Sequence, residues 1–118
     1  MRYSENHNKK RRIVIDFKYA LSFFDFMVEK AYQGDTGKRG DYYCGITNDL
    51  DRRASEHNAE FLGYVECDSK DTAIEVETIL GDNGYDIGKK AGNGAKDNSI
   101  FVYIYKKTHT TIEDVPDD

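Results

Sequence analysis

The most reactive side chains of the sequence recur at a regular spacing. Arg53 lies four positions after Asp49 and four positions before His57, and residues four apart share one face of a helix. That face then carries a guanidinium and an imidazole directly after a tyrosine-rich segment, an arrangement suited to binding an anion and moving protons. A second interpretation is a surface helix stabilised by ion pairs, because Arg52 and Glu56 are also four residues apart.

Glu77 is the second candidate, because it interrupts an apolar pattern. At about 100° per residue, the apolar residues of segment 73–80 form one arc of a helix, and Glu77 falls inside that arc whereas Glu75 points away. A lone buried carboxylate is costly, so Glu77 is expected to have a partner: a cation such as Arg53, a tyrosine hydroxyl or Mg²⁺. The alternative is a glutamate at the edge of the arc whose carboxylate reaches solvent.

A glycine-rich stretch between residues 81 and 96 contains three basic side chains, Lys89, Lys90 and Lys96. It lacks the glycine spacing and the hydroxyl residue of the Walker phosphate loop, which argues against nucleotide binding by that device. Two interpretations remain. The stretch is a cationic loop that contacts a nucleic-acid backbone, or it is a solvated turn.

The elements that must position these residues follow from hydrophobic periodicity and capping residues. Residues 13–17 are expected to form a short strand or to lead into the first helix. Asn48 is expected to cap the second helix, and Gly81 or Gly84 to end the third. The predicted elements are a helix at 18–32, a strand at 41–47, a helix at 49–57, a strand at 61–67, a helix at 70–80 and a strand at 100–105. The fold class is therefore α/β in the α+β sense, with a small mixed or antiparallel central sheet flanked by helices.

The length of 118 residues gives room for one domain. We expect a flexible basic N-terminus at 1–12, the domain at 13–107 and an acidic, disordered tail at 108–118. The net charge is −5, but without the four acids of the last six residues 17 basic side chains face 18 acidic ones. Because the basic residues are clustered, the acidic mean does not exclude a nucleic-acid partner.

Two further features bound the function. No apolar run is long enough to span a membrane, and the first twelve residues lack the apolar stretch of a signal peptide, so we expect no membrane partner and a cytoplasmic location. Cys44 and Cys67 lie far apart without a paired motif, which predicts reduced thiols rather than a disulfide or zinc site.

In residues 43–53, continuing to His57, and again in residues 73–80, the sequence resembles the GIY-YIG nuclease superfamily. The first segment is similar to the second signature strand and the arginine helix of that family. The second is similar to the helix that bears its metal-binding glutamate. The resemblance implies a metal-dependent endonuclease that hydrolyses phosphodiester bonds of DNA, with RNA not excluded, and Mg²⁺ or Mn²⁺ as cofactor.

The resemblance also implies roles for individual residues. Tyr43 matches the tyrosine of the second motif, Arg53 the arginine that stabilises the scissile phosphate, and His57 an accessory histidine. Glu77 matches the metal ligand. The late asparagine of the family falls on Asn98, with Asn93 as the rival position. The residues expected to contact nucleic acid are Arg52, Lys89, Lys90, Lys96 and Asn98.

The first signature strand of the family has no clear counterpart. Tyr32 has the right spacing, or the aromatic strand at 101–105 supplies a hydroxyl from elsewhere in the sheet. The missing motif favours an alternative function, a catalytically degenerate module of the same fold that binds nucleic acid or a protein. A third interpretation is an unrelated α/β interaction domain that forms a homodimer through helix 18–32.

Overall fold

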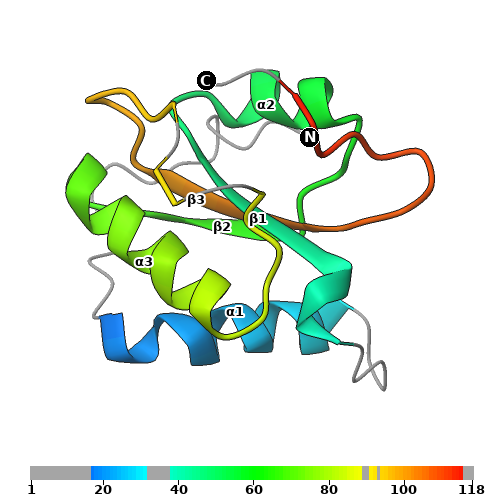
Figure 1. The fold of residues 1–118 in the computed structure, drawn as a ribbon, viewed down its shortest axis with the longest axis horizontal. Coiled ribbons are helices and arrows are strands. Elements are labelled where there is room, and N and C mark those ends of the chain that lie inside the picture. Colours follow the sequence, from blue (N-terminus) through cyan, green and yellow to red (C-terminus); the bar gives the residue numbers. More distant parts are fainter. Residues whose placement is uncertain (1–16, 32–37, 89–90, 93, 116–118) are drawn as a thin grey trace.

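The computed structural model describes residues 17–31, 38–88, 91, 92 and 94–115 (Figure 1). In chain order the elements are α1 (Phe17–Ala31), the short 3₁₀ helix η1 (Arg39–Asp41), β1 (Tyr42–Thr47), α2 (Leu50–His57), β2 (Gly63–Glu66), α3 (Lys70–Asp82) and β3 (Phe101–Lys106). The helices and strands predicted from residue 18 onward are confirmed in kind and order, with ends that differ by one or two residues. The strand or helix approach expected at 13–17 lies, up to residue 16, outside the described residues. None of the described helices is both long and apolar enough to cross a membrane.

The last strand in the chain is the central strand of the sheet. The order is β1-β3-β2, and both pairings are antiparallel. At the outer edge of β1, Asp86 forms a parallel bridge with Tyr43, so the loop after α3 runs along that edge. The coarse prediction of a small sheet flanked by helices in an α+β fold is confirmed, and its named strands pair only antiparallel.

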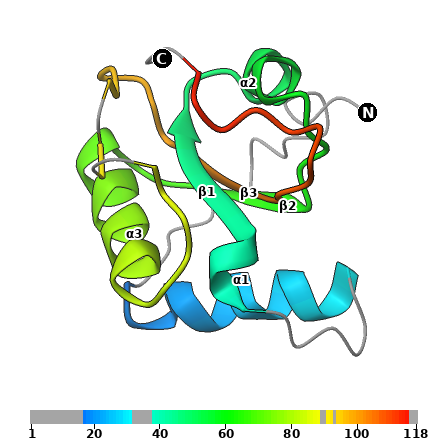
Figure 2. The same ribbon diagram turned by 45° about the vertical axis from the view of Figure 1, so that its right-hand side comes forward.

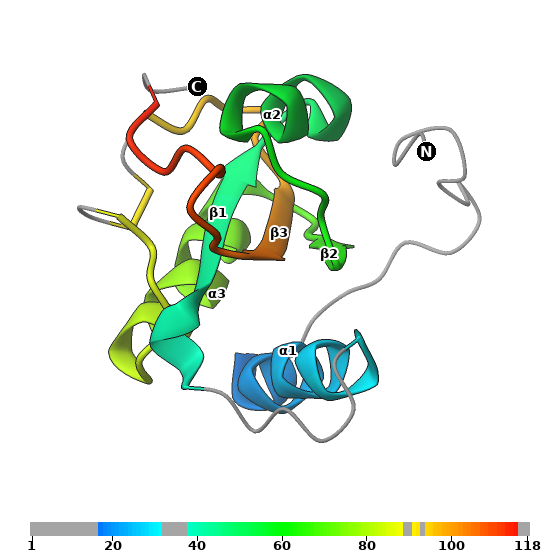
Figure 3. The same cartoon turned by 90° about the vertical axis from the view of Figure 1, so that its right-hand side faces the viewer.

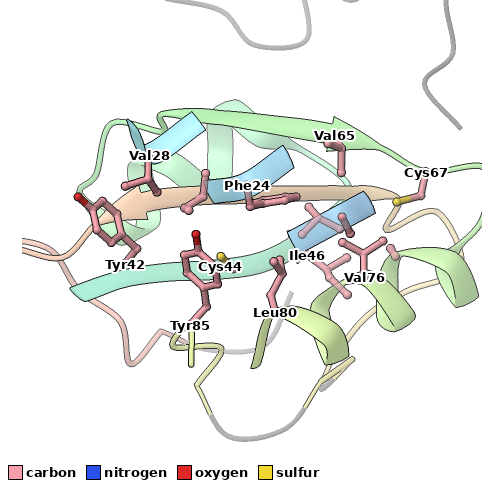
Figure 4. Packing of buried hydrophobic residues seen from close by; sticks show 14 residues of the cluster. Phe24, Val28, Tyr42, Cys44, Ile46, Val65, Cys67, Val76, Leu80 and Tyr85 are labelled. Atoms are coloured by element: carbon pink, nitrogen blue, oxygen red, sulfur yellow. The ribbon is translucent and has the colours of Figure 1, made fainter. Parts of the chain in front are cut away.

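The two faces of the sheet are covered by different helices. Figures 1 and 2 show α1 and α3 on one face and α2 on the other. Because successive strand residues point to opposite faces, Cys44 packs with Phe24, Val76 and Leu80 in the larger apolar cluster beneath α1 and α3 (Figure 4). The face beneath α2 holds the aromatic cluster, which consists of Tyr43, Leu50, Phe61, Tyr103 and Tyr105.

Helix α2 begins one residue later than its capping pattern predicts. Asp49, not Asn48, is the N-cap, and its side chain accepts a hydrogen bond from the Arg52 backbone N–H (3.1 Å). The reason is local: the Thr47 hydroxyl accepts from the Asp49 N–H (3.0 Å), which fixes Asp49 in the extended conformation of a cap. The helix ends at Asn58, whose left-handed φ of 51° is typical of a helix C-terminus.

Helix α3 begins at a Ser69 cap and continues to Asp82, past one of the two glycines expected to end it. Gly81 remains helical because it is a packing residue: a β-carbon there would lie 2.6 Å from the Ile87 side chain. Gly84, with φ of 106°, lies in the turn that follows. The helix therefore ends between the two glycines, and the close approach at Gly81 brings the loop after α3 back against the helix.

The segment after β3 differs from the expected disordered tail. Residues 108–115 form a turn at Thr108–Thr111 and then run beside α2 (Figure 3). The backbone N–H of Ile112 donates to the carbonyl of His57 (2.7 Å). The acidic composition predicted a solvated segment. Its backbone groups instead form hydrogen bonds with the end of a helix. Residues 116–118 lie outside the described residues.

Candidate functional site

Three other predicted catalytic residues lie around Tyr43: its ring centroid is 5.1 Å from that of His57, and the charges of Arg53 and Glu77 both act on its hydroxyl. The four residues come from three elements: Tyr43 from β1, Arg53 and His57 from α2, and Glu77 from α3. All four are buried, although every one of them carries a group that ionises or bears charge. Tyr32 lies outside the described residues.

Glu77 is buried, as the helical pattern of α3 predicts. Its side chain is 5% exposed, which excludes the alternative of a carboxylate in solvent. Its partner is a backbone group that the sequence did not indicate: the N–H of Gly92 donates to Oε1 (2.8 Å). Burial raises the pKa of Glu77 to about 7, and the Gly92 hydrogen bond only partly opposes this. Glu77 therefore changes charge near neutral pH.

Tyr43 lies between the sheet and the loop after α3. A β-carbon at Gly88 would lie 3.0 Å from the Tyr43 hydroxyl, so the loop backbone passes directly over that group. Burial, and then the charges of Glu77 and Asp86, raise the pKa of Tyr43 to about 12, while Arg53 acts in the opposite direction. Tyr43 is therefore a neutral phenol at physiological pH.

Two side chains hold the guanidinium of Arg53. Nη1 donates to Glu56 Oε1 (2.8 Å), and a second hydrogen bond joins the guanidinium to the Tyr103 hydroxyl. Burial lowers the pKa of Arg53, but the hydrogen bonds and charges of Glu56 and Tyr103 together outweigh it, so the net direction is upward. The expected surface ion pairs of α2 are present as well, since Glu56 also contacts Arg52 (3.5 Å). The residue spacing on α2 thus agrees with both interpretations, a reactive helix face and a helix stabilised by ion pairs.

His57 is fully buried and faces the sheet rather than solvent. Its Nε2 lies 2.8 Å from the Tyr103 hydroxyl, and its Nδ1 lies 2.6 Å from the carbonyl oxygen of Ile112. Burial lowers the pKa of His57, and the hydrogen bond to Ile112 opposes this. A direct contact between His57 and a phosphate is not compatible with this position.

Tyr103 and Tyr105 on β3 were not singled out as site residues. Both are buried, and their rings stack on Phe61 at centroid distances of 4.2 and 5.9 Å. Tyr103 contacts both site residues of α2. The structure thus places one of the two predicted sources of a hydroxyl, the aromatic strand at 101–105, beside Arg53. Alternating aromatic residues in that strand were the available signal.

The expected nucleic-acid contacts are partly described. Arg52 donates from Nη2 to the Thr47 hydroxyl (3.3 Å). Asn98 is exposed, and its Oδ1 accepts from the side chain of Asn48 (3.1 Å), which places it at the N-terminus of α2. Lys96 is exposed on the same loop, and its N–H donates to Ser99 (2.9 Å). Lys89 and Lys90 lie outside the described residues.

The donor set fits a weakly chelated hard cation better than a structural metal. Among the described residues, no group of three or more His, Cys, Asp or Glu side chains is placed to hold a metal ion. A Mg²⁺ held by one or two carboxylates and completed by water and phosphate oxygens needs no such group. Glu77 fits this pattern, because only Oε1 accepts a hydrogen bond within the described part of the chain.

Comparison of the chain with protein-family models, with curated proteins and with solved structures finds no match.

Proposed function

We propose that the chain is a divalent-metal-dependent endonuclease that hydrolyses phosphodiester bonds of DNA, of the GIY-YIG type that its sequence resembles. The observation that carries the proposal is the convergence of three buried polar side chains from three elements: Tyr43 of β1, Arg53 of α2 and Glu77 of α3. The charges of Glu77 and Arg53 act with opposite sign on the same Tyr43 hydroxyl, so both lie near it.

These groups match what the reaction needs. The barrier to phosphodiester hydrolysis is the charge that builds up on the phosphate and on the leaving oxygen. A Mg²⁺ or Mn²⁺ ion bound at Glu77 would supply a Lewis acid for that charge. Arg53, whose guanidinium Glu56 holds in place, donates hydrogen bonds to phosphate oxygens. Tyr43 orients the attacking water through its neutral hydroxyl.

The proposal extends to the partners. Arg52, Lys96 and Asn98 lie at or near the N-terminus of α2 or on the loop beside it, where they would contact the DNA backbone. Lys89 and Lys90 are proposed for the same role. We place the activity in the cytoplasm. A homodimer through α1 stays a prediction, and it would cover the exposed side chains of Tyr19, Phe23 and Phe26.

One observation favours the second candidate, a catalytically degenerate module of the same fold. Tyr43, Arg53 and Glu77 are 8%, 7% and 5% exposed, so a substrate reaches them only if the loop over Tyr43 moves. A domain that had lost catalysis would bind nucleic acid or a protein on its surface and leave these residues as core groups.

The test is plasmid nicking by the full chain in Mg²⁺, in Mn²⁺ and in EDTA. Glu77→Gln keeps the shape of the side chain and removes its charge, and Glu75→Gln, on the exposed side of α3, is the matched control. Circular dichroism checks that both variants fold. Metal-dependent nicking that is lost in Glu77→Gln and kept in Glu75→Gln supports the proposal.

Two other results would favour a different function. DNA binding by the folded wild-type chain without nicking would select the degenerate module. If the chain neither binds nor nicks DNA, the remaining candidates are an RNA substrate and a protein partner. The same assay with structured RNA distinguishes these two.

A further inference from the structure

The segment that follows β3 reaches back to the aromatic face and bonds to two of its side chains. The carbonyl oxygen of Ile112 lies 2.6 Å from His57 Nδ1, and the carboxylate of Glu113 accepts a hydrogen bond from the Tyr105 hydroxyl (2.9 Å). Tyr105 in turn lies 3.1 Å from the same His57 nitrogen. Figure 2 shows the segment, coloured orange-red, beside α2.

We propose that Ile112 and Glu113 are positioning residues of the candidate site: they hold His57 as one tautomer and, through Tyr103, fix the orientation of the Arg53 guanidinium. The inference rests on the proposed function only for its effect on cleavage. Its structural part concerns the direction of four hydrogen bonds.

The groups at the two ends of this network, the Ile112 carbonyl and the Arg53 guanidinium, fix the direction of its hydrogen bonds. A backbone carbonyl only accepts hydrogen bonds, so the proton between His57 and Ile112 must be on Nδ1. A neutral imidazole carries one proton, hence Nε2 is an acceptor and the Tyr103 hydroxyl donates to it (2.8 Å). A guanidinium only donates, so the oxygen of Tyr103 accepts from Arg53. Each group then has a consistent donor and acceptor.

The other hydrogen bonds of the network agree with these donor and acceptor assignments. Since Nδ1 carries a proton, Tyr105 cannot donate to it and donates to Glu113 instead. His57 stays neutral because it is fully buried and because burial lowers its pKa. The charge of Glu113 works against that shift. In the other tautomer Nδ1 would carry no proton and would face the Ile112 carbonyl oxygen, so two acceptors would lie 2.6 Å apart.

The consequence for the site is a fixed guanidinium. Tyr103 cannot rotate freely, because its ring stacks on Phe61 at 4.2 Å between centroids and its proton points to His57. Its oxygen and the Glu56 carboxylate therefore both hold the guanidinium of Arg53. Such preorganisation spares the cation a reorganisation cost when it meets a phosphate. The segment 108–115 is thus part of the site although it contributes no group to the substrate.

The experiment compares two substitutions at one position. Ile112→Pro removes the backbone N–H that donates to the His57 carbonyl (2.7 Å) and so releases the segment, whereas Ile112→Ala keeps that N–H and trims only an exposed side chain. Nitrogen-15 NMR of the full chain at pH 7.5 (about the working pH) reads the His57 tautomer and the hydrogen exchange of the Arg53 guanidinium. The nicking assay runs in parallel.

We expect wild type and Ile112→Ala to hold His57 as the neutral Nδ1–H tautomer with slow exchange at Arg53. Ile112→Pro should mix the tautomers, speed the exchange on the order of tenfold, and lower kcat on the order of 100-fold with little change in KM. An Nε2–H or a charged His57 in wild type overturns the inference, and so does a released tautomer with unchanged Arg53 exchange and kcat. If the NMR results are as expected but no variant nicks, the positioning network stands and the proposed function fails.

Discussion

Tyr103 lies directly over Gly45, its partner across the pairing of β1 with β3. A β-carbon at position 45 would fall 2.6 Å from Tyr103 Cζ, closer than carbon atoms approach in proteins. The ring cannot move aside, since it stacks on Phe61 and bonds to His57. The lack of a side chain at Gly45 therefore makes room for the Tyr103 phenol beside Arg53.

Gly45→Ala should consequently destabilise the fold by about 1–3 kcal/mol, the usual cost of overpacking a filled core. Urea denaturation measures the loss. Gly40→Ala is the control, because its β-carbon would meet Gly84 O at an ordinary 3.6 Å. Equal stability of the two variants would show that Tyr103 does not occupy this place.

The stability of the chain should fall as the pH rises from about 4.5 to about 7. Unfolded glutamate loses its proton near 4.5, whereas burial keeps Glu77 protonated in the folded chain up to about 7. The folded state then binds more protons within this window, so the free energy of unfolding decreases with pH. The total loss from Glu77 is on the order of 3 kcal/mol.

Glu77→Gln has no carboxylate to ionise and should lose this slope, so it should be more stable than wild type at pH 8 and not at pH 4. Denaturation at both pH values measures the difference, and Glu75→Gln should keep the wild-type slope. Parallel pH profiles of wild type and Glu77→Gln would mean that Glu77 is not the buried acid.

Mg²⁺ should stabilise the wild-type chain at pH 8, where Glu77 is ionised, through binding to the folded state alone. A concentration 100 times Kd adds about 2.7 kcal/mol, which raises Tm by several degrees for a domain of this size. Thermal scans with added K⁺ at equal ionic strength provide the salt control. A shift of the same size in Glu77→Gln would place the ion elsewhere.

Local patterns predicted the helices and the burial of Glu77 because they depend on residues within one turn of each other. The 3.6-residue period put Glu77 in the apolar arc of α3, and 5% exposure confirms it. Capping was less exact: Asn48 and Asp49 are both good caps, and the Thr47 hydroxyl decides between them. The choice of cap depends on a contact in three dimensions, although Thr47, Asn48 and Asp49 are neighbours in sequence.

The partners of the site residues were beyond the sequence because they are distant in the chain or belong to the backbone. The bond of Glu77 is to a backbone N–H at Gly92, and that of His57 is to a backbone carbonyl at Ile112. Any residue offers those groups, so no pattern marks them. Tyr103 reaches Arg53 only because β3, last in the chain, pairs beside β1.

Tyr43→Phe tests whether the phenol at the edge of β1 acts on a substrate or only fills the core. The ring should keep its place, since it stacks on Tyr105 at 5.4 Å between centroids, so we expect little change in Tm. Loss of the hydroxyl that orients water should lower kcat on the order of 100-fold. Tyr64→Phe, on the same face but on β2 and outside the site, is the matched control.

The pH dependence of the same assay identifies the group that limits the rate. Tyr43 has its pKa raised to about 12, so it remains a neutral phenol throughout the working range. Glu77, with a pKa of about 7, gains its charge within that range. Nicking should therefore rise as the pH passes about 7 and level off well below the ionisation of Tyr43. A rate that continues to rise toward pH 11 (about the limit of the assay) would instead mean that the phenolate of Tyr43 is the active form.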